Sequence, residues 1–74
     1  MNIKEVIELI EKYIADPKSV SQRELRAACD AAYDAAYSDA SWYAWCAVRT
    51  ALPGDIDGTK RWVAKYQEII KENV

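Results

Sequence analysis

The chain has 74 residues and a mass of 8.4 kDa, which allows one small domain and excludes a two-domain enzyme. Its hydrophobic content of 51% overstates the core, because 12 of those residues are alanine and none is phenylalanine. Ten Lys and Arg against 12 Asp and Glu give a net charge of −2. That balance argues against a general nucleic-acid binder, which would carry a strongly basic surface.

The compartment expected from the sequence is the cytoplasm. The chain has no run of about 18 apolar residues that would predict a membrane-spanning helix. Its N-terminal segment alternates charged and aliphatic residues and lacks the cleavage site of a signal peptide. A core of this size supplies roughly 3 to 5 kcal/mol, so a disulfide, a metal or a partner subunit is usually added. The number and positions of the cysteine and histidine residues indicate which of these three this chain uses.

The first predicted helix spans residues 3–15. Its apolar residues recur at the spacing of one helix face, namely Ile3, Val6, Ile7, Ile10, Tyr13 and Ile14. Asn2 is placed to cap this helix, and the pair Asp16-Pro17 ends it, because the residue before a proline is pushed out of the helical region.

The second predicted helix runs from residue 22 to residue 52. Ser21 and Glu24 have the spacing of a capping box, and no Gly or Pro follows before Pro53. Such a helix of about 30 residues is about 45 Å long, more than either flanking helix can cover. The alternative is a break within residues 38–41, where Ser38 or Asp39 would cap a new helix.

A short repeat lies inside this segment, as Asp30-Ala31-Ala32-Tyr33 followed by Asp34-Ala35-Ala36-Tyr37. Ten of the 25 residues from 27 to 51 are alanine. Their small side chains would let another helix approach closely, in a tight hairpin or in a dimer. The alternative is that alanine is present simply because it is the best helix former.

The last predicted helix spans residues 60–72, with Asp57 or Thr59 as its cap and Trp62, Val63, Tyr66, Ile69 and Ile70 on its apolar face. No segment alternates as a strand does. The sequence therefore predicts an all-α fold: a single domain over residues 1–74, built as a small bundle of three helices, or four if the central helix breaks. The uncovered length of the central helix predicts a homo-oligomer.

The residues favour a protein without catalytic activity, metal or cofactor. Histidine, the usual general base and commonest metal ligand, is absent. Cys29 and Cys46 fall in mid-helix, where nothing activates a thiol. On a continuous helix they lie about 25 Å apart, too far for a disulfide, so a bridge between them would prove the break.

The candidate binding site is an aromatic stripe. If Leu25 marks the centre of the buried face, Trp45 lies near the opposite pole of a continuous helix. Trp42 and Arg49 lie beside it, and Arg49 is placed for a cation–π contact with Trp45. Tryptophan and arginine are the residues of binding hot spots. Three interpretations remain open: a second core face under the first or last helix, a self-association surface, or a partner or ligand site.

Four further residues complete the candidate site. Tyr43 is the aromatic neighbour of the stripe, and Lys60, Arg61 and Lys65 follow in the last predicted helix. If the ligand were a nucleotide, an aromatic ring would stack on the base, and one of these cations or Arg49 would meet the phosphate.

Residues 13–48 resemble the alanine-rich region of small phage and mobile-element proteins that are labelled immunity proteins. The resemblance rests mainly on the segment 21–28 and on the two Asp-Ala-Ala-Tyr units, whereas the aromatic segment 42–45 and the last predicted helix depart from it. It implies a setting in the conflict between phages and bacteria, in the host cytoplasm, where small non-catalytic proteins block or sequester a component. It brings no catalytic residues.

We therefore expect an anti-defence or immunity-type protein that acts by stoichiometric binding. Its target would be a bacterial defence protein or a small signalling nucleotide. The alternative is a structural or assembly protein whose function is its own helical oligomer.

Overall fold

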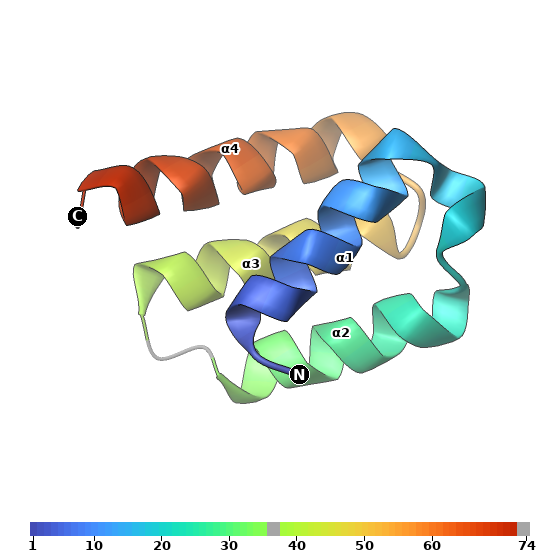
Figure 1. The fold of residues 1–74 in the computed structure, drawn as a ribbon, viewed down its shortest axis with the longest axis horizontal. Helices are drawn as coiled ribbons and strands as arrows, with labels where there is room; N and C mark the ends of the chain where they lie inside the picture. The colour runs from blue at the N-terminus through green and yellow to red at the C-terminus, as the bar shows by residue number, and fades with distance from the viewer. Residues whose placement is uncertain (36–37, 73–74) are drawn as a thin grey trace.

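The computed structural model describes residues 1–35 and 38–72 (Figure 1), and of Glu72 only the backbone. The described chain is helical and contains no strand, which confirms the all-α prediction. Its elements are α1 (Ile3–Ala15), the short 3₁₀ helix η1 (Pro17–Ser19), α2 (Gln22–Asp34), α3 (Asp39–Ala51) and α4 (Ile56–Glu72).

Helix α1 has the predicted bounds because both of its ends are fixed locally. The Glu5 amide donates to Asn2 Oδ1 at 2.8 Å, and the Asn2 amide donates to the Glu5 carboxylate at 3.0 Å. These bonds satisfy two of the amides that a helix start leaves without partners. At the other end, Asp16 has an extended backbone and its side chain caps η1.

The predicted continuous helix over residues 22–52 is wrong, and the alternative break is what the structure shows. Helix α2 starts at the predicted capping box of Ser21 and Glu24. Helix α3 is a new helix that begins at Asp39 and is capped by Ser38, whose hydroxyl accepts from the Ser41 amide at 3.3 Å. Two of the predicted repeat residues, Ala36 and Tyr37, lie outside the described part of the chain.

Packing explains this break. A single helix about 45 Å long would leave much of its apolar surface in water, whereas two shorter helices cover each other. The Ser38 cap offsets part of the cost of interrupting the backbone hydrogen bonds.

The last helix starts at Ile56, one turn before the predicted residue 60. Its N-terminal cap is Asp55, whose carboxylate accepts from the Gly58 amide at 3.0 Å. The predicted caps Asp57 and Thr59 are wrong, because both lie inside the first turn. Gly54 has a φ of +87°, a left-handed conformation that glycine adopts at little cost, and the chain reverses there between α3 and α4.

The corner between α3 and α4 is closed by buried hydroxyl groups. Thr59 is fully buried, and its Oγ1 lies 3.0 Å from Oγ1 of Thr50. Thr59 Oγ1 also lies 2.8 Å from the Asp55 carbonyl oxygen, and the Asp55 amide donates to the Thr50 carbonyl at 3.0 Å. Each buried polar group at this corner therefore has a partner.

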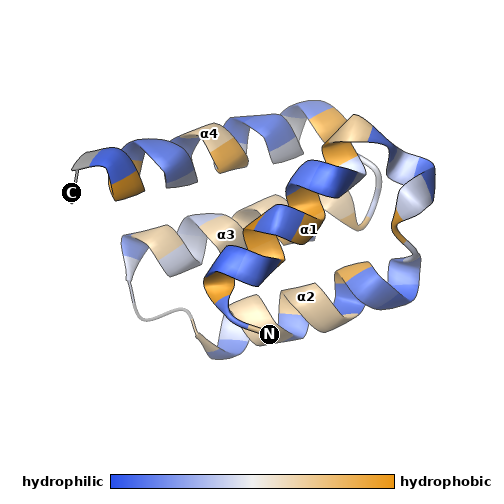
Figure 2. Ribbon diagram, in the orientation of Figure 1, coloured by the Kyte–Doolittle hydropathy of each residue, from blue (hydrophilic) through white to orange (hydrophobic). Residues whose placement is uncertain are grey.

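Helix α3 is the centre of the fold. Helices α2 and α4 lie on either side of it, and α1 crosses the three on one face (Figure 1). Hydrophobic and hydrophilic residues alternate in stripes along α1 (Figure 2). The largest fully buried apolar side chains are Val6, Ile10, Leu25 and Val48.

The alanines allow this close packing within the chain. Five of them, on α2 and α3, have no exposed surface: Ala28, Ala32, Ala44, Ala47 and Ala51. Small side chains permit a short distance between helix axes. Helices α2 and α3 form a hairpin, and Ala28, Ala32, Ala47 and Ala51 lie in the core that they share.

Candidate binding surface

Three aromatic rings and one arginine form a continuous surface across α2 and α3, which we call the aromatic surface: Tyr33, Trp42, Trp45 and Arg49. The Trp45 ring centroid lies 5.8 Å from that of Tyr33 and 4.9 Å from that of Trp42, both in tilted arrangements. The Arg49 guanidinium carbon lies 4.8 Å from the Trp45 ring centroid. The predicted cation–π contact is therefore present.

Exposure differs strongly along this surface. Tyr33 is 65% exposed and Trp42 is 49% exposed. Trp45 is half-buried against the main hydrophobic core, and Arg49 is exposed. Trp45 thus supports the two outer rings from below, and Tyr33 and Trp42 present apolar area to solvent.

The helix break explains why Trp45 is not where a continuous helix would place it. On an unbroken helix, Trp45 would point away from the buried face. In the hairpin, α2 returns beside α3 and Tyr33 lies against Trp45. The element that covers part of the stripe is therefore α2, and neither the first nor the last helix contributes a ring to it.

Tyr33 is the residue of this surface that sequence reasoning missed. It contacts the stripe only because the chain doubles back between α2 and α3. The signal that could have found it is the alternative break at residues 38–41, which makes the two halves of the segment antiparallel neighbours.

Tyr43 does not join the aromatic surface. It is half-buried on another side of α3 and stacks on Trp62 of α4, with ring centroids 5.6 Å apart and planes inclined by 27°. Its position between α3 and α4 gives it a packing role.

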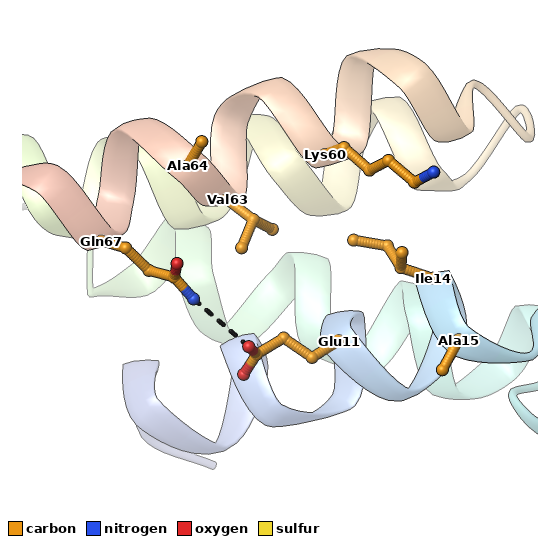
Figure 3. Close-up of a pocket in the computed structure, with 7 residues that line it drawn as sticks. All are labelled: Glu11, Ile14, Ala15, Lys60, Val63, Ala64 and Gln67. Atoms are coloured by element: carbon orange, nitrogen blue, oxygen red, sulfur yellow. Dashed lines mark hydrogen bonds between the residues drawn. The ribbon is translucent and has the colours of Figure 1, made fainter.

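The three cations of α4 do not gather around the tryptophans. Lys60 lines a hollow between α1 and α4 (Figure 3). Arg61 and Lys65 are exposed and share one helix face at the i, i+4 spacing. Trp62 and Val63 form the inner side of α4, since Trp62 stacks on Tyr43 and Val63 is buried. Arg61 and Lys65 are therefore on the solvent side of this helix.

A groove separates α1 from α4, and we call it the α1–α4 groove. Figure 3 shows one end of it, where side chains of the two helices face each other across a hydrogen bond. Gln67 Nε2 donates to Glu11 Oε2 at 3.2 Å. On either side of this bond lie hollows of about 340 Å³ and about 500 Å³. Apolar side chains make up four of the seven residues that line the smaller hollow, among them the buried Val63, and three of the seven that line the larger, among them the buried Tyr66.

The two cysteines are free thiols, although the helix break is present. Burial raises the pKa of the Cys29 thiol, and the side chain of Trp45, which can donate to the thiolate, partly opposes this. Burial likewise raises the pKa of Cys46, and the charge of Arg49 partly opposes it. Both thiols are therefore protonated near neutral pH, which makes them poor nucleophiles.

Within residues 1–35 and 38–72, no group of three or more acidic or cysteine side chains is placed to hold a metal ion. In the same part of the chain, none of the helices is sufficiently long and apolar to cross a bilayer. Comparison with family models, with curated proteins and with solved structures finds no match to this chain.

Proposed function

We propose that this chain is a non-enzymatic protein that binds a protein partner with 1:1 stoichiometry through the aromatic surface. The observation that carries the proposal is the exposure of Tyr33 and Trp42 beside Trp45 and Arg49. Large aromatic rings held rigidly next to an arginine are typical of the anchors that dominate binding energy. The contacts that Tyr33 and Trp42 make with Trp45 restrict their rotation, which reduces the conformational entropy lost on binding.

The geometry favours a protein over a nucleotide as the partner. A nucleotide that carries several phosphate charges would need more than one cation near the ring on which its base stacks. Arg49 lies over Trp45, but Lys60 lies in the α1–α4 groove, and Arg61 and Lys65 occupy the outer face of α4. A flat protein surface needs no such cluster of cations.

The biological setting that we propose is the conflict between a phage and its bacterial host, in the host cytoplasm. The support for it is the resemblance of residues 13–48 to small alanine-rich phage and mobile-element proteins. In that setting the partner would be an effector protein of a bacterial defence system, and binding would occlude it.

A structural or assembly role is the second candidate. Its support is the same exposed apolar area at Tyr33 and Trp42, which a second copy of the chain could cover. A concentration-dependent dimer in light scattering that disappears on Trp42→Ala would favour this role. A monomer at all concentrations would remove it.

The proposed function is tested by phage challenge of bacteria that carry defined defence systems. Expression of the chain should raise plaque formation on at least one such strain, and the defence protein should copurify with it in equal amounts. The variant Trp42→Ala should lose both effects while keeping its helical circular dichroism. Lys65→Ala, an exposed change elsewhere, is the matched control and should keep both.

Two results would contradict the proposal. Protection and copurification that survive the double change at Tyr33 and Trp42 to alanine would place the binding site elsewhere. Heat released on titration with a cyclic nucleotide, and abolished by Trp42→Ala, would assign the aromatic surface to a nucleotide and not to a protein.

A further inference from the structure

The α1–α4 groove has a pattern of charge along its length. Lys4 lines one end and Lys60 the other, and the carboxylates of Glu8 and Glu11 lie between them. The order along the groove is therefore positive, negative, negative, positive. The centre of the groove is acidic, and its floor on both sides is apolar.

The two hollows of this groove are spaced like the side chains of a helix. Ile7 lines one hollow and Ile14 the other, and these residues are two turns apart on α1, at about 10.5 Å. A helix lying along the groove would therefore place apolar side chains i and i+7 into the two hollows. Its residue i+3 or i+4 would then lie over Glu11, midway between them.

Apolar area is available to such a helix. Ile70, at the rim of the larger hollow, is 40% exposed. Each hollow is within the range of about 300 to 1,000 Å³ that is typical of sites for bound groups. The deeper residues Ile7, Val63 and Tyr66 are already buried, so the apolar area open to a partner lies at the rim, on Ile14, Ala64 and Ile70.

We propose that the α1–α4 groove is a second binding site, separate from the aromatic surface, and that it takes an amphipathic helix of a partner protein. The helix carries apolar residues at i and i+7 and a Lys or Arg at i+3 or i+4. Its basic residue meets the carboxylate of Glu11, which is the centre of negative charge in the groove. This assignment does not rest on the aromatic surface or its partner.

The charge pattern disfavours a second copy of this chain as the occupant. The order positive, negative, negative, positive reads the same from both ends. A two-fold axis at the centre of the groove would therefore bring Lys4 of one copy to Lys60 of the other, and Glu8 to Glu11. Like charges at close range oppose such a dimer.

The test uses two alanine-based helical peptides as probes, with leucine at i and i+7 and either lysine or glutamate at i+4. Binding to the ¹⁵N-labelled protein is followed by amide chemical shifts. We expect the lysine peptide to shift the amides of Ile14, Val63 and Gln67, and to bind roughly tenfold more tightly than the glutamate peptide, as for one close charge pair. Ile70→Ser should weaken its binding roughly fivefold by removing apolar contact.

Reversing the charge at Glu11 separates specific recognition of the basic residue from nonspecific binding of the peptide. Glu11→Lys should reverse the preference, so that the glutamate peptide binds more tightly. Asp39→Lys makes the same change of charge at the start of α3 and should leave the preference as it was. Circular dichroism checks that each variant remains folded.

Three results would overturn the assignment. The first is equal binding of the two peptides. The second is a set of shifts confined to the aromatic surface. The third is a concentration-dependent shift of groove amides without peptide, which would show that a second copy fills the groove. None of these results bears on the phage-challenge test of the aromatic surface.

Discussion

Replacing Trp45 and Trp42 by alanine, one at a time, should separate the support of the aromatic surface from its exposed part. Removing a buried tryptophan costs about 3 to 5 kcal/mol. Trp45 is half-buried, contacts two rings at 5.8 and 4.9 Å and lies under Arg49. Half of the burial cost plus about 1 kcal/mol for the ring pairs gives about 3 kcal/mol for Trp45→Ala. Trp42 is 49% exposed, has one of these ring contacts and, unlike Trp45, is not among the residues packed on the main core, so no core-burial cost applies and Trp42→Ala should cost about 1 kcal/mol.

Urea unfolding followed by far-ultraviolet circular dichroism measures these costs. A domain of this size has roughly 3 to 5 kcal/mol of stability in total. We therefore expect Trp45→Ala to be close to half unfolded without denaturant at the low end of that range. Trp42→Ala should remain folded, with a modestly lower urea midpoint. For this reason Trp42, and not Trp45, is the residue with which to test binding.

Equal losses of stability in the two variants would refute this reasoning, because they would show that the rings share one environment. A loss below about 1 kcal/mol in Trp45→Ala would refute it too, since a ring that packs on the core cannot be removed so cheaply. Ring contacts would then contribute little to the α2–α3 pairing.

Three further predictions concern the core, a cap and pH. Ala47→Leu should lower the free energy of unfolding by about 1 to 3 kcal/mol in urea titration, because the site is fully buried, whereas Ala27→Leu on the exposed side of α2 should change it by less than about 0.5 kcal/mol. Ser38→Ala should cost about 1 kcal/mol by loss of the α3 cap and Ser38→Asp should cost little, and equal thermal midpoints for the two would contradict the capping role. Burial raises the pKa of the Cys46 thiol and of the Tyr66 phenol above their ordinary values, so the folded state holds these protons more tightly than the unfolded state. The contribution of these groups to stability should therefore be complete at neutral pH and be lost as the pH rises through the alkaline range, and Cys46→Ala should reduce that loss in urea midpoints measured across this range.

Two of the helix starts that depend on neighbouring residues could be predicted from the sequence, whereas the local cap of α4 at Asp55 was predicted wrongly. The capping boxes at Asn2 and Ser21 involve residues only three positions apart, and both are present. The break before α3 could be named only as an alternative. The local signal for a helix start at Ser38 is weak. Whether the helix breaks there depends on the surface area that α2 and α3 bury against each other, and a local sequence pattern does not contain that area.

The candidate site was predictable to the same extent. The helical period predicted that Trp42 and Arg49 lie beside Trp45 on one stripe, and the structure shows these contacts, but the period left open whether the stripe is core or surface. Tyr33 joins them through the hairpin, a contact between separate helices. Tyr43 was predicted to lie beside the stripe but packs away from it, because its ring stacks on Trp62 of α4.

The hydroxyl corner at Thr50 and Thr59 has a consequence for the order of folding. It links two helices that are close in sequence, and contacts of short sequence separation form fastest. The α3–α4 hairpin is therefore the natural nucleus, on which α2 and then α1 can pack. During synthesis on the ribosome this nucleus includes the helix that is made last. The alanine-rich α2 emerges earlier, and its packing surfaces are α1 and α3, so it docks on the α3 side of this nucleus.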